Sequence, residues 1–177
     1  KYIPDNEANS VADLCGDLPL ALSLAGGVLR AEPDLPTSDY IEEVRSWRLE
    51  TLVSESRGLS IRNVFESSYS RLNEDGQRGL RALSVMPDRF DVEAALAVVS
   101  PEKTLSPLAK RGLSKVLRDL TRRNVIGYDE TLARYKLHDL MREFAYAKQT
   151  PAERELALEK HIDYFMGVTQ NAHDLFK

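Results

Sequence analysis

The sequence has 177 residues, of which 42% are hydrophobic, 29% charged and 7% aromatic, and its formal net charge is −4. This composition is typical of a soluble globular protein and excludes a disordered chain. No apolar run reaches the roughly 20 residues that cross a bilayer, and no signal peptide opens the sequence, so we expect a soluble protein with no membrane partner. The negative charge argues against general affinity for nucleic acid.

The chain contains a single cysteine, Cys15, next to Leu14 at an apolar helical position. One cysteine cannot form an intrachain disulfide, which indicates a reducing compartment, and we expect a cytoplasmic protein. Nothing in the sequence places a base beside the thiol, so we interpret Cys15 as a small core residue. We expect neither catalytic residues nor a metal site in this chain.

The first third of the chain predicts three helices. The first runs over 7–15 and ends at Gly16, and Asp17 can cap a second, over 18–30, with Pro19 in its first turn. One face of the second helix is predicted to combine Leu18, Leu22, Ala25 and Leu29. Asp39 and Glu42 make a capping-box-like start for a third helix that passes Trp47 and Leu52.

The middle of the chain predicts four more helices after a domain boundary at Gly58. The residues that define them are Ile61, Val64, Phe65, Ser68 and Leu72 for the first; Asn73 as cap with Leu80, Leu83 and Met86, ended by Pro87, for the second; Asp91 to Val99 for the third; and Ser106-Pro107 as the start, with Leu113, Val116, Leu117 and Leu120, for the fourth.

Two β-rich stretches follow, "NVIGYDE" and "ARYKLH", and they predict one hairpin. Asp139 can then cap a helix to about Lys148, and Thr150 to Glu153 form a capping box for a last helix that reaches Phe176. The predicted fold is mainly α: a small helical bundle over 1–58, a winged-helix domain with one β-hairpin over 59–148, and a C-terminal helix over 149–177 that leads to a further domain.

Three motifs follow one another along the chain. They are "CGDLPLALSLAGGVLR" from Cys15, "VFESSYSRLNEDGQRGLRALSVMPDRFD" from Val64 and "RYKLHDLMREFA" from Arg134. The first resembles the Gly-Leu-Pro-Leu motif of NB-ARC proteins, the second the opening of their winged-helix domain, and the third their Met-His-Asp motif. In this order they make nearly the whole chain resemble the NB-ARC group of STAND nucleotide-binding switches. Asp17 replaces the first glycine of that pattern, and Leu137 replaces its methionine.

The resemblance implies a function and three contact residues. In the family, these two domains clamp an adenine nucleotide that a preceding P-loop domain holds, so Pro19 would pack on the adenine, Ser23 would lie near the phosphates and His138 would bond the β-phosphate of ADP. ADP or ATP would bind the full-length parent, not tightly this fragment alone. The resemblance also implies a C-terminal repeat domain and a homo-oligomer that forms on activation.

The residues fit these roles on physical grounds. Pro19 and Ser23 are four apart, so a helix places a rigid apolar ring above a hydroxyl. His138 precedes a helix N-terminus, which favours an anion. Taken singly, each has an ordinary structural reading: a helix-start proline, a solvated hydroxyl and a structural histidine. His161 and His173, on the last helix, carry no functional argument.

The sequence contains no Gly-x-x-x-x-Gly-Lys-[Ser/Thr] stretch, so this chain has no phosphate-binding loop and is not expected to hydrolyse ATP, although a parent that supplies the loop would be an NTPase.

Two other functions stay open. Residues 107–124 carry six basic residues against one acid, and Arg111, Lys115, Arg118 and Arg122 share one helical face, which suits a DNA recognition helix or a contact between domains. The last helix places Leu158, Ile162, Phe165 and Met166 on one face, which suits a helical protein-interaction module.

Overall fold

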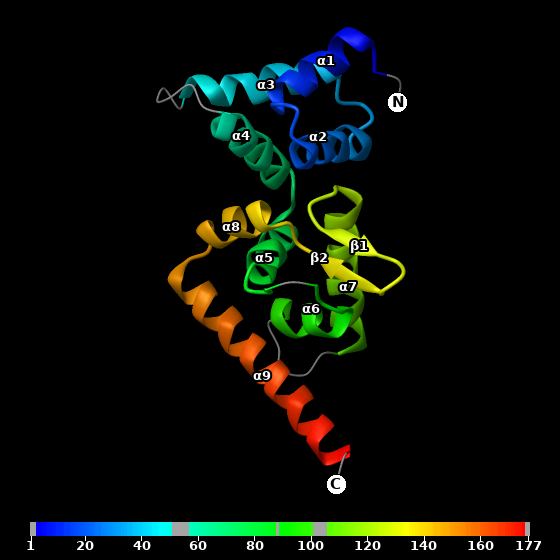
Figure 1. Ribbon diagram of the computed structural model, residues 1–177, viewed down its shortest axis with the longest axis vertical. Coiled ribbons are helices and arrows are strands. Elements are labelled where there is room, and N and C mark those ends of the chain that lie inside the picture. The colour runs from blue at the N-terminus through cyan, green and yellow to red at the C-terminus, as the bar shows by residue number, and fades with distance from the viewer. Residues whose placement is uncertain (1–2, 51–56, 88, 101–105, 176–177) are drawn as a thin grey trace. The chain divides into compact units, whose positions relative to one another are not determined.

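The computed structural model describes residues 3–50, 57–87, 89–100 and 106–175, which form nine helices and one two-stranded antiparallel sheet (Figure 1). These residues gather into two compact units. The first contains the chain up to Asn73 together with Arg122–Val125, and the second contains Glu74–Thr121 and the chain from Ile126 onward. The mainly α fold predicted from the sequence is confirmed.

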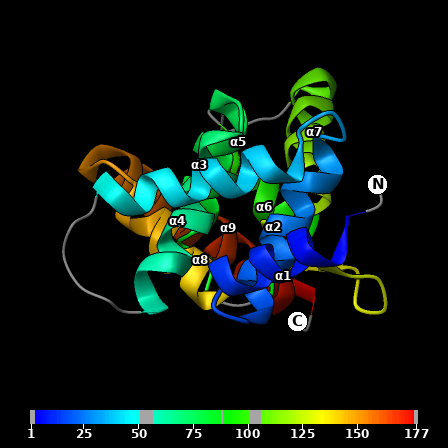
Figure 2. The same cartoon turned by 90° about the horizontal axis from the view of Figure 1, so that it is seen from above.

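The first unit is a bundle of four helices, α1 (Asp5–Leu14), α2 (Pro19–Ala31), α3 (Thr37–Glu50) and α4 (Arg57–Ser70). Helix α1 packs against α2 and α3, and α4 packs against the same two helices. Figure 2 shows α3 passing across α4. Leu24, Ala25 and Val64 are fully buried in this core. Cys15 is also buried, as predicted for a core residue.

The turn between α1 and α2 corrects one predicted cap. The amide of Asp17 donates to the Ala12 carbonyl and the amide of Gly16 donates to the Asp13 carbonyl, which is the Schellman arrangement that closes a helix C-terminus. Gly16 and Asp17 both have positive φ, 59° and 55°. Asp17 therefore ends α1 and does not cap α2, whose N-cap position is Leu18 with no side-chain cap bond.

The four residues predicted to share one face of α2 are not equally buried. Its buried residues include Ala21, Leu24, Ala25, Val28 and Leu29, whereas Leu18 and Leu22 are 37% and 36% exposed. Of the four residues predicted to share one face, Ala25 and Leu29 are buried and Leu18 and Leu22 are partly exposed. The outer face of α2 is therefore partly apolar.

Two further boundaries differ from the prediction. Helix α3 begins at Thr37, so Asp39 lies within its first turn and is not its cap. Gly58 lies inside α4, which belongs to the first unit, and the two units divide between Asn73 and Glu74. The predicted passage of α3 through Leu52 and the predicted end of the last helix at Phe176 both fall outside the described residues.

The second unit has the element order of a winged helix. It contains α5 (Glu74–Leu83), α6 (Val92–Val99), most of α7 (Pro107–Arg122), β1 (Gly127–Asp129), β2 (Arg134–Lys136), α8 (Asp139–Ala147) and α9 (Pro151–Leu175). Helix α7 starts at Pro107, as predicted, and α6 lies within the predicted span, where the Asp91 side chain caps it by accepting from the Ala94 amide at 2.8 Å. Leu80, Leu83 and Leu120 are fully buried in its core.

The predicted hairpin is confirmed and has one additional partner. Tyr128 pairs with Tyr135 across β1 and β2, and Phe90 joins Tyr135 through an isolated antiparallel bridge with hydrogen bonds of 3.0 and 2.8 Å. The rings of Phe90 and Tyr135 stack with their centroids 6.0 Å apart. The segment before α6 therefore anchors the base of the wing.

The capping box of α9 is confirmed. The Thr150 hydroxyl accepts from the Glu153 amide at 3.2 Å, and the Glu153 carboxylate accepts from the Thr150 amide at 2.9 Å. Arg81 on α5 donates to the same carboxylate at 2.6 Å, which ties the start of α9 to the winged-helix core. In the part of the chain that the structure describes, none of the helices has the length and apolar character needed to cross a membrane.

Candidate functional site

Helix α2 presents the two residues of the first motif on its outer face. Pro19 occupies the first helical position and is exposed, and Ser23 is exposed one turn later. Leu18 and Leu22 flank them and are also partly exposed. The structure thus assembles an apolar surface with one hydroxyl at its edge, which can hold a flat apolar ring beside a polar group. The two leucines were predicted only to share a helical face with Ala25 and Leu29, and were not among the candidate contact residues.

The backbone beneath Ser23 is bonded to a distant segment. The side-chain amide of Asn124 donates to the Ser23 carbonyl at 2.8 Å, although the two residues are 101 positions apart. In an α-helix the carbonyl of residue 23 faces the amide of residue 27. Asn124 therefore contacts α2 on the side of the helix where the Ser23 carbonyl and the Gly27 amide lie. The Ser23 hydroxyl is left out of this contact and stays on the exposed face.

His138 is the N-cap of α8, where the prediction had placed Asp139. Its Nδ1 accepts from the Leu140 amide at 3.3 Å, and the side chain is exposed. A ring nitrogen that accepts a hydrogen bond carries no hydrogen, so the hydrogen of the neutral imidazole lies on Nε2. His138 therefore presents an N–H donor beside the free amides of a helix N-terminus, a combination suited to an anion.

The neighbours of His138 hold it in this position. Leu137 and Met141 on either side of it are buried, at 2% and 0% exposure, and anchor the strand end and the first turn of α8. Arg142 forms an ion pair with Asp139 at 3.0 Å and also donates to the carbonyl of Pro87. The leucine that departs from the family pattern at position 137 thus fills the core as an apolar anchor.

The three residues of the two motifs belong to different units. Pro19 and Ser23 lie in the first unit and His138 lies in the second. Each is exposed at or near the N-terminus of a helix, as a ligand contact requires. That all three meet at one nucleotide stays a prediction.

The basic face predicted on α7 is exposed. Arg111, Lys115 and Arg118 are exposed, while Leu117 and Leu120 on the opposite side are 2% and 0% exposed. Arg122, the last residue of α7, is exposed as well.

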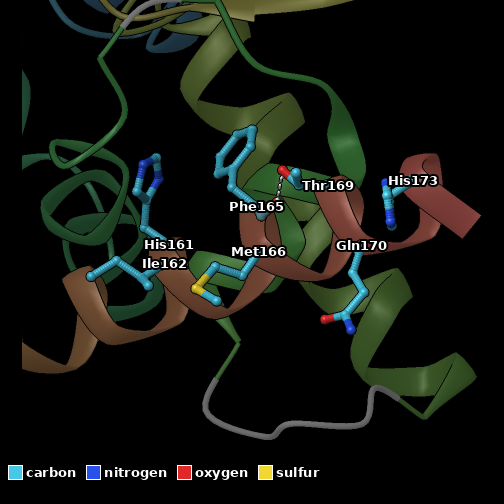
Figure 3. A pocket seen from close by; sticks show the side chains of 7 residues that line it. All are labelled: His161, Ile162, Phe165, Met166, Thr169, Gln170 and His173. Carbon is cyan, nitrogen blue, oxygen red and sulfur yellow. Dashed lines mark hydrogen bonds between the residues drawn. The ribbon is translucent and has the colours of Figure 1, made fainter.

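The last helix has an exposed apolar face, as its spacing predicts. Ile162, Phe165 and Met166 are 54%, 40% and 64% exposed and line an open hollow along α9 (Figure 3). His161 and His173 border the same hollow, and the His161 ring lies 4.7 Å from that of Phe165. Thr169 turns its hydroxyl back to the Phe165 carbonyl at 2.8 Å, so it adds little polarity.

Burial, and secondly the charge of Asp17, raises the pKa of the Cys15 thiol to about 11, so the thiol is protonated at neutral pH. Among the residues that the structure describes, no three His, Cys, Asp or Glu side chains gather as a metal ion would need.

Comparisons with known proteins place the chain among regulators only at a distance. No family model matches it. The chain is 27% identical over 173 residues to "Regulatory protein AfsR" of Streptomyces griseus, a match that covers 95% of this chain and 17% of that protein. It is 26% identical over 176 residues to "Disease resistance protein RML1B" of Arabidopsis thaliana, covering 95% of this chain and 16% of that protein. The chain thus spans about a sixth of these relatives, and the two matches give it a distant link to NB-ARC and STAND regulatory proteins.

Proposed function

We propose that this chain is the nucleotide-reporting part of a longer regulatory protein of the NB-ARC type. A preceding P-loop domain would hold ADP or ATP, Pro19 with Leu18 and Leu22 would cover the adenine, and Ser23 would lie toward the phosphates. His138 would bond the β-phosphate of ADP in the resting state. The distant likeness to a regulatory protein and a disease resistance protein supports this class of function.

The observation that carries the proposal is the state of His138. Its Nδ1 accepts from the Leu140 amide, so Nε2 is the ring nitrogen that would contact a ligand. A hydrogen bond to a charged group contributes about 1.5–3 kcal/mol, which changes a two-state population roughly ten- to hundredfold. One imidazole is therefore enough to bias the protein between a closed ADP form and an open form that oligomerises.

The test is ADP retention by the full-length protein that contains this chain. His138→Ala should release ADP about tenfold faster or more, and should oligomerise more readily without an activating signal. His173→Ala is a matched control, because His173 lies on α9 outside the proposed site. Equal ADP release by the His138→Ala variant and the wild type would remove His138 from the mechanism.

DNA binding is the second candidate, and the exposed basic face of α7 favours it. Arg111, Lys115 and Arg118 occupy the third helix of the winged-helix order, which is the recognition helix in DNA-binding members of this architecture. Binding of this chain to duplex DNA that weakens with salt and with Arg118→Ala would support it. A lack of binding at low salt would leave this face for contact with another domain.

A further inference from the structure

The segment Arg122–Val125 belongs to a different unit from the residues on either side of it. Helix α7 up to Thr121 and the chain from Ile126 onward lie in the second unit, whereas these four residues lie in the first. The chain therefore passes between the units at three places, after Asn73, after Thr121 and after Val125. If the segment left the first unit, one crossing would remain.

Helix α2 holds this segment by its backbone. Arg30 donates to the Arg122 carbonyl at 2.7 Å and to the Asn124 side chain at 3.0 Å, and Asn124 donates to the Ser23 carbonyl at 2.8 Å. Asn124 adopts a positive φ of 57°, which asparagine tolerates better than most residues. Val125 closes the segment with a side chain that is only 2% exposed.

Gly27 makes the close approach possible. A Cβ at this position would lie 2.2 Å from the carbonyl oxygen of Arg123 and 2.6 Å from its carbonyl carbon, far inside van der Waals contact. Gly26, its neighbour on the same helix, has open space where a Cβ would be. Of these two adjacent glycines, Gly27 is the one whose missing side chain leaves space for the Arg123 peptide. We call this space the socket.

One carboxylate joins the segment to the rest of the bundle. Glu32, at the end of α2, accepts from Arg123 at 3.1 Å and from Arg71 at 3.1 Å. Arg71 lies just before the first crossing point and also pairs with Glu43 on α3. Glu32 therefore contacts the chain near each place where it leaves the first unit.

We propose that Arg122–Val125 is a detachable clasp, whose docking on α2 restrains the winged-helix unit and whose release leaves that unit tethered at one point. The clasp, and not α2, is the part that moves, because Leu24, Ala25 and Val28 fix α2 in the core. The clasp is held by hydrogen bonds to α2, an ion pair with Glu32 and the buried Val125 side chain, a set of contacts small enough for local opening without unfolding of either unit. This inference does not require a nucleotide, so it stands or fails separately from the proposed function.

Limited trypsin digestion of this chain, analysed by mass spectrometry, tests the clasp. The bonds after Arg122 and Arg123 are trypsin sites, and docking engages both carbonyls with α2. Gly27→Ala should expel the clasp and speed cleavage at these two bonds at least about tenfold, whereas Gly26→Ala should leave their cleavage at the wild-type rate. Both substitutions raise helix propensity equally, so they differ only in the socket.

Equal cleavage in the two alanine variants, with helical circular dichroism intact, would overturn the proposal. If Gly27→Ala fails to fold, Asn124→Gly decides, because glycine keeps the positive φ but removes the side-chain bonds to Ser23 and Arg30. Faster cleavage and faster amide exchange over 122–125 would support the clasp, and wild-type rates would overturn it. Ser23→Ala serves as its control, since the clasp uses the carbonyl and not the hydroxyl of Ser23.

Discussion

Asp17 adopts a left-handed backbone conformation, which few side chains tolerate. Asp17 stands where the family pattern has glycine, and its φ of 55° lies in the left-handed region that glycine adopts without strain. The departure from the pattern is therefore one of residue type and not of backbone shape. The sequence motif marked the position, but only the structure shows that the residue closes α1.

A pair of substitutions checks this conformational argument. Asp17→Gly and Asp17→Ala remove the same carboxylate, but alanine must still adopt the left-handed backbone. We expect the glycine variant to exceed the alanine variant in free energy of unfolding by about 1 kcal/mol, measured by urea denaturation. Equal stabilities would mean that the turn relaxes to another conformation when the carboxylate is lost.

Cys15 gives a second prediction at this scale. Burial and the nearby Asp17 charge raise its pKa to about 11, so little thiolate forms at pH 8. We expect a thiol reagent at pH 8 to modify the folded protein at least about a hundredfold more slowly than the urea-unfolded protein. Comparable rates would show that the thiol reaches solvent.

At the scale of elements, apolar spacing predicted where helices occur, whereas caps were predicted less well. Asp139 and His138 are adjacent and either can cap, and the choice falls on His138 because Leu137 and Met141 enter the core around it. Thr150 was predicted correctly, since it is the single cap-forming side chain directly before the proline that opens α9. A single candidate is not sufficient, because Asp17 was the one predicted cap of α2 and instead closes α1.

The start of α9 should depend on pH through Glu153. The hydrogen bond from Arg81 is the main cause that holds the pKa of Glu153 below its ordinary value, and bonds with Thr150 act in the same direction. A carboxylate whose folded pKa is lowered stabilises the fold above its unfolded pKa, and this stabilisation is lost as the pH falls through the folded pKa. The capping box should therefore weaken in acid.

Glu153→Gln measures this contribution. At pH 7 we expect the free energy of unfolding to fall by about 1 kcal/mol, since the ion pair with Arg81 and the charged cap are both lost. The difference from wild type should shrink as the pH is lowered from about 5 toward 2. Glu155→Gln, on the exposed side of the same turn, is the control, and a similar loss there would point to general charge effects.

At the scale of the whole molecule, the sequence predicted a mainly α fold with one hairpin. It did not predict which residues belong to each of the two compact units. Helix α4 packs on α2 and α3, and Arg122–Val125 docks on α2, although both were assigned to the winged-helix domain. The Asn124–Ser23 bond joins residues 101 positions apart, and neither apolar spacing nor turn composition carries such information.

The central claim is that Pro19, Ser23 and His138 contact one nucleotide in the full-length protein. The most direct measurement is a crystal structure of that protein with ADP bound. We expect His138 Nε2 to lie within about 2.7–3.2 Å of a β-phosphate oxygen and the Pro19 ring within about 4 Å of the adenine. A structure in which ADP is bound with His138 turned to solvent and Pro19 away from the base would contradict it.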